Sequence, residues 1–104
     1  MENTFKIGDI LDYEWGYDQT NVEFFQVVGI TASGKSVKIR KIKQTCIGAN
    51  DMTGTCIALK DQFIENAPVL IKRVKSYKDQ PIVVMDYSTA DKWNGLPVSY
   101  SSYA

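Results

Sequence analysis

Apolar and polar residues alternate with a period of two along most of this chain, which is the pattern of β-strands that bury one face. From Gly8 to Trp15 the alternation places Leu11, Tyr13 and Trp15 on the buried side. From Val22 to Thr31 both alternating sets are largely apolar, which is typical of a central strand covered on both faces. The first third of the chain therefore predicts two strands, the second of them central.

The residues that follow predict a hairpin. Thr31 to Lys35 has the composition of a tight connection, in which Gly34 supplies a positive φ. Ser36 to Lys43 predicts the returning strand, but its alternation breaks after Arg40. We therefore expect a β-bulge near Arg40 and Lys41.

Shorter elements fill the second half of the chain. Glycine and asparagine between Thr45 and Thr55 predict a loop or a hairpin tip, and strands are expected at Cys56–Leu59, Val69–Tyr77 and Ile82–Tyr87. Ser88 to Asp91 has the spacing of a helical N-cap, which predicts one short helical turn. The tail from Leu96 to Ala104 predicts an added edge strand or a loosely held end.

These elements predict a mainly β fold of five or six strands with one short helical turn. The expected architecture is a small, strongly bent antiparallel sheet or a partly open SH3-like barrel. With 104 residues the chain is expected to form a single domain over 1–104. Its longest purely apolar run, Ile82 to Met85, is too short to span a membrane, and the N-terminus lacks the features of a signal peptide. We expect a cytoplasmic protein with no membrane association.

Charge and cysteine content narrow the possible chemistry. The formal net charge is zero, but acidic residues predominate in 1–34 and basic residues in 35–60, which predicts a dipolar molecule. Cys46 and Cys56 could form a disulfide across a hairpin, although in a reducing cytoplasm two small half-buried thiols are the expected state. The chain has no histidine, so we expect no metal site and no cofactor.

We expect no enzymatic activity. Without histidine the candidate acids and bases are carboxylates such as Asp12, Glu14, Asp18 and Asp86, and none belongs to a diagnostic pair. A cysteine nucleophile would lack its usual imidazole partner. A binding protein is the remaining class.

Two segments are candidates for binding. The basic segments 35–43 and 70–78 would suit phosphate groups, with solvated strand faces as the alternative. The turn from Trp15 to Asn21 offers rigid aromatic rings and amides as binding anchors, with a hairpin turn that caps the barrel as the alternative. The candidate binding residues are Trp15, Tyr17, Asp18, Gln19, Asn21, Lys38, Arg40, Arg73, Lys75 and Trp93.

Several runs in the chain also carry a resemblance. Gly8-Asp9-Ile10, Trp15-Gly-Tyr-Asp-Gln-Thr-Asn-Val22, Phe24 to Val28, Lys72-Arg73-Val74 and the region from Ala90 to Pro97 resemble a group of small uncharacterised proteins encoded by bacteriophages, prophages and other mobile elements. The resemblance covers most of the chain, and the Trp-Gly-Tyr-Asp-Gln-Thr-Asn core is its specific part. Residues 44 to 57 depart from it, because they are longer than the short loop expected there.

The resemblance implies a setting inside a bacterial host. Small accessory phage proteins without catalytic machinery commonly act by stoichiometric binding, and host antiviral systems are a recurring target. We therefore expect an inhibitor or sequestering factor that acts against a bacterial defence component. The alternative is a nucleic-acid-binding accessory module. The sequence does not decide whether the partner is a host protein or an anionic nucleotide or nucleic acid. It also does not decide whether the chain forms a homo-oligomer.

Overall fold

The computed structural model describes residues 5–16, 20–48, 53–77, 80–85 and 88–101. These residues form an all-β structure, and no helix occurs among them. The strands are β1 (Ile10–Trp15), β2 (Asn21–Ile30), β3 (Ser36–Gly48), β4 (Thr53–Phe63), β5 (Leu70–Tyr77), β6 (Gln80–Val84), β7 (Thr89–Lys92) and β8 (Val98–Ser101).

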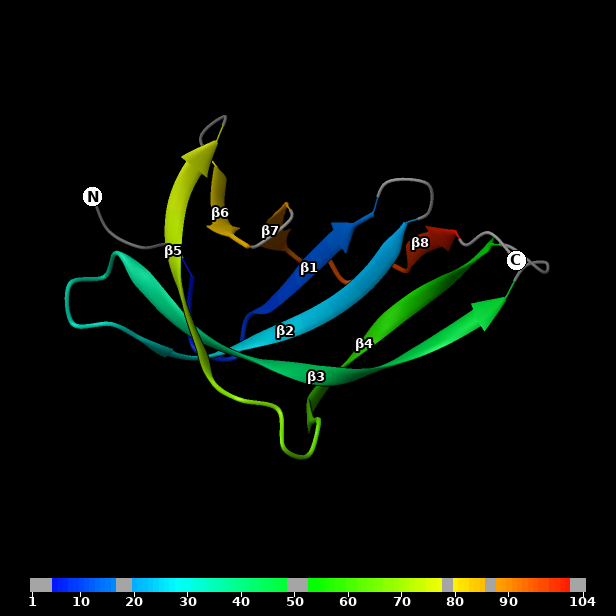
Figure 1. The fold of residues 1–104 in the computed structure, drawn as a ribbon, viewed down its shortest axis with the longest axis horizontal. Helices are drawn as coiled ribbons and strands as arrows, with labels where there is room; N and C mark the ends of the chain where they lie inside the picture. Colours follow the sequence, from blue (N-terminus) through cyan, green and yellow to red (C-terminus); the bar gives the residue numbers. More distant parts are fainter. Residues whose placement is uncertain (1–4, 17–19, 49–52, 78–79, 86–87, 102–104) are drawn as a thin grey trace.

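The eight strands form one antiparallel sheet in the order β2-β1-β7-β6-β5-β3-β4-β8. Because β2 also pairs with β3, the pairings of six strands form a closed circuit from which β4 and β8 extend. Long β2 and β3 run across the molecule, with β5 to β7 over one end and β4 and β8 at the other (Figure 1). The mainly β, antiparallel prediction is confirmed, whereas the expected number of five or six strands is wrong.

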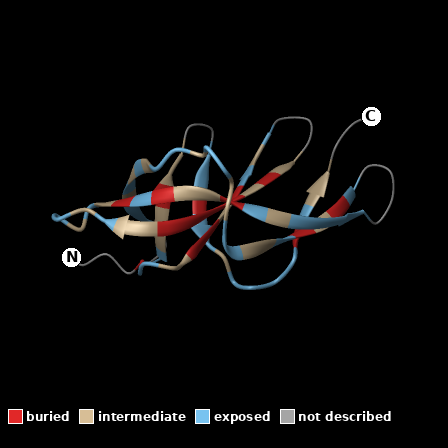
Figure 2. Ribbon diagram, turned by 90° about the horizontal axis from the view of Figure 1, so that it is seen from below, coloured by how far each residue is buried: buried red, intermediate tan, exposed pale blue. Residues whose placement is uncertain are grey.

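Two hydrophobic cores lie on opposite faces of β1 and β2, and the buried residues gather in the middle of the strands (Figure 2). The first core contains Phe5, Leu11, Tyr13, Phe25, Val27, Val37, Ile39, Val83 and Ala90. The second core contains Ile10, Val22, Phe24, Ile42, Cys56 and Val98.

Strand β2 separates the two cores. Phe25 and Val27 belong to the first core, whereas Val22 and Phe24 belong to the second. Burying a large apolar side chain contributes about 1.5–3 kcal/mol, so a strand that is covered on both faces is strongly fixed in register. The prediction of a central strand is confirmed.

Strand β3 passes from one core to the other. Val37 and Ile39 face the first core, and Ile42 faces the second on the opposite side of the sheet, so the alternation is unbroken. The register of β3 with β2 is regular at Arg40 and Lys41 and shifts instead between Val27 and Gly29 of β2. At Arg40 and Lys41 themselves the apparent break in the pattern marks a change of core, not a bulge. The irregularity of β3 lies slightly further on, where its register with β4 shifts between Ile42 and Gln44.

Ser88 to Asp91 is not helical. Residues 89–92 form β7, which pairs with both β1 and β6, and Ala90 is fully buried in the first core between exposed neighbours. The predicted helical turn is wrong, because hydrogen bonds to two neighbouring strands outweigh one local capping signal. The tail does supply an edge strand, β8, which confirms one of the two alternatives for it.

The segment expected to be a loop or a hairpin tip belongs to a hairpin. β3 continues to Gly48 and β4 begins at Thr53, so of the two alternatives the described residues on either side of 49–52 favour the hairpin, with longer strands than expected. Cys46 lies opposite Cys56, and the two are joined by a disulfide. The expectation of two free thiols is therefore corrected. The connection at Gly34 has the predicted positive φ, 75°.

Candidate functional site

The outer surface of β5 carries the most distinctive set of exposed side chains. Leu70, Lys72 and Val74 alternate with residues that point outward, and Ile71 and Tyr77 are 62% and 60% exposed. Lys38 of β3 lies directly opposite Ile71 and is exposed on the same side. We call this surface the basic face; it consists of Lys38, Ile71, Arg73, Lys75 and Tyr77.

The cations of the basic face have no ion-pair partner among the described residues. Ser36 lies opposite Arg73 and Ile82 lies opposite Lys75, so neither has an acidic cross-strand neighbour. Among the described residues, Lys38, Arg73 and Lys75 have no carboxylate within ion-pair distance. Within the part of the chain that the structure describes, no ion pair offsets the positive charge of these three side chains.

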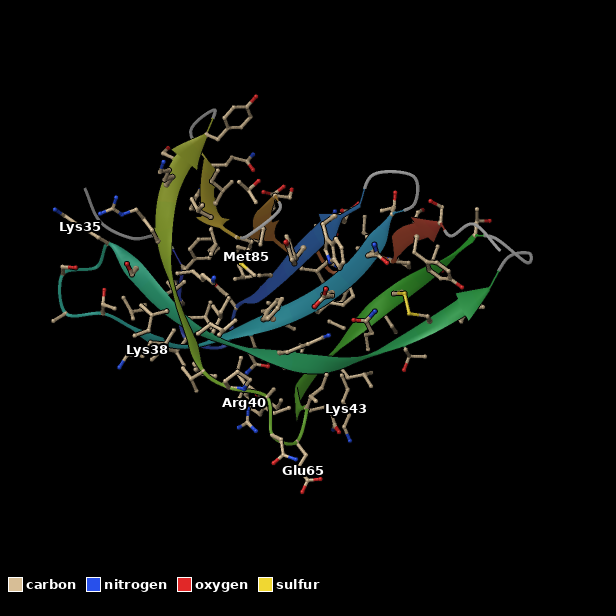
Figure 3. All side chains as sticks on the ribbon, viewed as in Figure 1. Lys35, Lys38, Arg40, Lys43, Glu65 and Met85 are labelled. Carbon is tan, nitrogen blue, oxygen red and sulfur yellow. A yellow bond between two sulfur atoms is a disulfide. The ribbon has the colours of Figure 1, made fainter. Side chains whose placement is uncertain are left out.

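Other charged groups are neutralised locally. Lys41 Nζ lies 3.1 Å from Glu23 Oε1, and Lys92 Nζ lies 3.5 Å from Asp9 Oδ2. The acidic N-terminal strands and the basic strands thus partly neutralise each other as neighbours. Lys35, in the connection before β3, and Lys38 of β3 take part in neither pair and point away from the sheet (Figure 3).

Arg40 is held inward by the end of β4 and by Ile64, which follows it. Its guanidinium donates a hydrogen bond of 3.2 Å to the Ile64 carbonyl oxygen and lies 5.2 Å from the centre of the Phe63 ring. Gln26 anchors the same segment, because its side-chain amide exchanges two 2.8 Å hydrogen bonds with Asp61. Arg40 therefore has a structural role and contributes less to the exposed positive surface than Lys38.

Trp15 and Asn21 stabilise the β1–β2 hairpin. The Trp15 indole Nε1 donates a 2.6 Å hydrogen bond to Glu23, and the Asn21 side chain donates one of 3.2 Å to the Trp15 carbonyl oxygen. The Trp15 ring also stacks on Tyr13 at a centroid distance of 6.4 Å. These contacts match the structural alternative for this turn. The other candidates in it, Tyr17, Asp18 and Gln19, lie outside the described residues.

Trp93 packs against the second core. Its ring meets Phe24 edge to face at 5.3 Å, and its Nε1 donates a 2.8 Å hydrogen bond to the Leu96 carbonyl oxygen. Both the ring and the polar atom therefore have partners within the fold. This leaves little of Trp93 for stacking on a ligand.

The structure separates the two predicted binding segments. Asn21 begins β2, whereas Lys38 pairs with Gly29 near its other end. Eight residues of extended strand span about 26 Å. Arg73 and Lys75 come together with Lys38, but Trp15 and Asn21 do not join them. Sequence reasoning missed Ile71, although the alternation over 70–77 predicts it on the same outward side.

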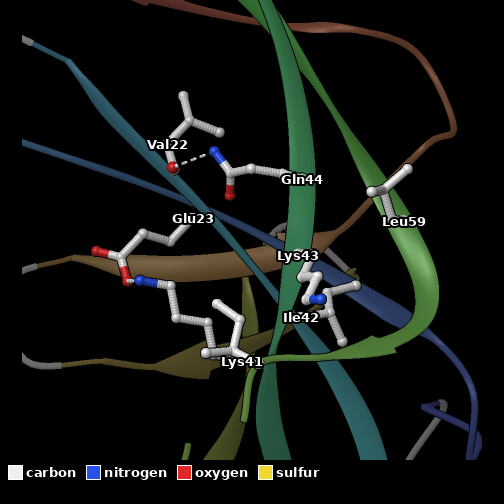
Figure 4. Close-up of a pocket in the computed structure, with 8 residues that line it drawn as sticks. Val22, Glu23, Lys41, Ile42, Lys43, Gln44 and Leu59 are labelled. Carbon is white, nitrogen blue, oxygen red and sulfur yellow. Dashed lines mark hydrogen bonds and ion pairs between the residues drawn. The ribbon is translucent and has the colours of Figure 1, made fainter.

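A groove lies between β2 and β3 where the two strands diverge. An opening of about 450 Å³ is lined by both strands together with Leu59 and Ile64. Gln44 crosses the gap and donates a 3.0 Å hydrogen bond to the Val22 carbonyl oxygen (Figure 4). The Glu23–Lys41 ion pair closes one side of the groove, and the candidate residue Arg40 lies beside it, because Arg40 donates to the carbonyl oxygen of Ile64, which lines the groove.

Asp12 has an unusual environment for a carboxylate. It is half-buried beside the second core, with one oxygen shielded from solvent and without a hydrogen-bond partner. Burial, followed by a hydrogen bond with Glu14 and the charges of Glu14 and Asp91, raises the pKa of Asp12 to about 7. The folded protein therefore holds a proton here that the unfolded chain releases above about pH 4.

Replacing Asp12 by asparagine should stabilise the protein in a pH-dependent way. The folded-state pKa is raised, so the wild type loses stability as the pH rises from about 4 to 7, and Asp12→Asn abolishes that loss. Because solvent screens a half-buried group, we expect a gain of about 1–2 kcal/mol at pH 8 and almost none at pH 4. Urea denaturation at the two pH values measures this. An equal gain at both would refute the assignment.

No cluster of three or more potential metal ligands and no helix capable of crossing a membrane occurs among the described residues. Comparisons with protein-family models, with curated proteins and with solved structures find no match. The resemblance to phage and mobile-element proteins stays a prediction.

Proposed function

We propose that this protein is a non-enzymatic binding protein of phage or mobile-element type that acts stoichiometrically against a component of bacterial antiviral defence. The observation that carries the proposal is the basic face, where Lys38, Arg73 and Lys75 form no ion pair with any described residue and lie beside exposed Ile71. Arginine and aromatic residues are enriched at protein interfaces, and uncompensated charge accelerates association with an oppositely charged partner. An acidic surface on a host protein fits this face.

The closed circuit of strands supports a second, structural part of the proposal. We take β2-β1-β7-β6-β5-β3 as a partly open SH3-like barrel, with the hairpin of β3 and β4 as an extension. In this architecture the basic face is a rigid outer wall that changes little on binding. Rigidity lowers the entropic cost of forming a stoichiometric complex.

Phage growth tests the function. Expression of the wild type should restore phage plating on at least one host of a panel that carries different defence systems. Arg73→Glu/Lys75→Glu should lower that restoration at least tenfold, because it reverses two cations at the centre of the basic face. Lys6→Glu/Lys60→Glu, with the same change in net charge at exposed sites elsewhere, should retain it. Unchanged plating on every host would refute the proposal.

A nucleic-acid-binding module is the second candidate, favoured by the exposed Tyr77 ring on the same face as Arg73 and Lys75. It predicts that a labelled single-stranded oligonucleotide binds with a log–log salt slope of about −2, since about three cations would be neutralised. Binding to a protein instead predicts a complex that survives size exclusion with little dependence on salt. Weak oligonucleotide binding without a salt slope would exclude this candidate.

A further inference from the structure

The sheet splits between β2 and β3 at a defined point. The two strands pair regularly at Gln26 with Arg40 and at Phe25 with Lys41, and the same register, continued for three more positions, would bring Val22 opposite Gln44. At that position the Gln44 side chain, not its backbone, reaches the Val22 carbonyl oxygen. The backbone ladder between the two strands has already ended at Phe25 and Lys41, and the side-chain amide of Gln44 bridges them three positions further on.

Beyond the split, one edge of β3 has no neighbour among the described strands. From Gln44 to Gly48, β3 pairs only with β4. The Cα atoms of Cys46 and Cys56 are 4.0 Å apart, which identifies this as a narrow, non-hydrogen-bonded pair of the antiparallel ladder. Alternation then turns the backbone N–H and C=O groups of Gln44, Cys46 and Gly48 away from β4.

The free edge extends from Gln44 to Gly48, and at its start it has a lysine and a register shift with β4 between Ile42 and Gln44. Native proteins shield such edges with short strands, lysines, prolines, bulges or inward charges, because unpaired backbone groups attract other strands. The protection is confined to the start of this edge. Here the neighbouring side chains are Lys43, which is exposed, and Ile47, which is 70% exposed. Openings of about 450 and 200 Å³ flank Gln44 and leave room for incoming side chains.

We propose that the β3 edge from Lys43 to Gly48 binds an extended, acidic segment of a protein partner by strand addition. Backbone groups at Gln44, Cys46 and Gly48 would pair with the incoming chain, which is the standard chemistry of β-augmentation. We expect the partner segment to be acidic because Lys43 offers a positive charge at this edge. Lys43 has no carboxylate partner among the described residues, whereas Lys41 forms an ion pair with Glu23. A nucleic acid cannot complete a backbone ladder.

This inference shares with the proposed function the assumption that the partner is a protein. It concerns a different surface from the basic face. The two can therefore fail separately. Reversal of Arg73 and Lys75 tests the basic face, whereas the experiment below changes neither residue.

Amide exchange measured by NMR tests the edge with a short synthetic peptide that alternates glutamate and valine. In the free protein, the amides of Gln44, Cys46 and Gly48 should exchange fast and those of Thr45 and Ile47 slowly. The peptide should slow the first set at least tenfold. A peptide of the same charge, N-methylated at alternate backbone amides, should not, because it cannot complete the ladder.

Two variants of Gln44 separate the effect on strand addition from the effect of losing the hydrogen bond between Gln44 and Val22. Gln44→Ala and Gln44→Pro both remove the bond to Val22, but only proline removes the edge donor. Gln44→Ala should bind the peptide at least as well as the wild type, and Gln44→Pro at least tenfold less. Slow exchange at these amides in the free protein, equal binding of the methylated peptide, or equal binding by both variants would overturn the proposal. Protection of these amides that rises with the concentration of the protein, without peptide, would also overturn the proposal. It would indicate that the edge pairs with a second copy of the chain.

Discussion

Phe24→Ala should lower the free energy of unfolding by about 3–5 kcal/mol, the largest effect we expect of any single substitution described here. The Phe24 side chain is fully buried at the centre of the second core. Its removal leaves a cavity and deprives the Trp93 ring of its edge-to-face contact at 5.3 Å. The neighbouring strands cannot collapse into the space, because β2 is held on its other face by the first core.

Urea denaturation followed by tryptophan fluorescence measures the loss, and the Trp93 environment should report it directly. Leu96→Ala is the matched control, since its side chain is 62% exposed and should change stability by less than about 0.5 kcal/mol. A loss below about 1 kcal/mol for Phe24→Ala would show that the second core is not a packed unit.

Reduction of the Cys46–Cys56 disulfide should lower the free energy of unfolding by about 2.7 kcal/mol, the value that chain entropy assigns to a loop of ten residues. The bond joins the two strands of the hairpin where β3 lacks its other neighbour. Opening it frees the end of the sheet, while the first core is untouched. We therefore expect the fold to survive in its reduced form.

Denaturation of the wild type with and without a thiol reductant measures this difference. Cys46→Ser/Cys56→Ala serves as the control, because the reductant should not change its stability. Serine suits the exposed position and alanine the buried one, since Cys56 is 2% exposed. Free thiols titrated in the untreated protein would contradict the bond itself.

The alternation of residues was sufficient to predict β1, β2 and β5, together with their buried sides. In these strands the local preference and the tertiary environment agree, because one or both faces meet a core. The outward set that contains Arg73 and Lys75 was predictable for the same reason. The sequence could not predict that Arg73 and Lys75 have no acidic cross-strand neighbour, because this depends on which strands pair with β5.

Errors arose where a local signal competed with a distant partner. The capping pattern at Ser88 gave way to β7, whose residues pair with strands on both sides. The glycines around the hairpin tip suggested a loop, but Gly54 lies under the Tyr100 ring, where a Cβ atom would collide with that ring and with the Ile47 carbonyl oxygen. Glycine here permits close packing and does not mark a loop.

The roles of the candidate binding residues also depended on the tertiary structure. Arg40 and Trp93 carry the residue types of a binding site, yet each contacts a segment distant in sequence or packs on a core. Lys38, with the same charge as Arg40 and two positions away, points to solvent. The sequence cannot distinguish these two cations, because residues two apart in a strand point to the same side of the sheet. Arg40 is covered only because the end of β4 and Ile64 pack over it.

By itself, the sequence determined a mainly β chain with a doubly covered central strand and a basic outward set on β5, because periodic burial is a local property of strands. Tertiary structure alone decided the eight-strand order, the split between β2 and β3, the disulfide and the free edge at Lys43–Gly48. These features depend on pairing between residues far apart in the chain, whose energies are set by register and by the cores they enclose.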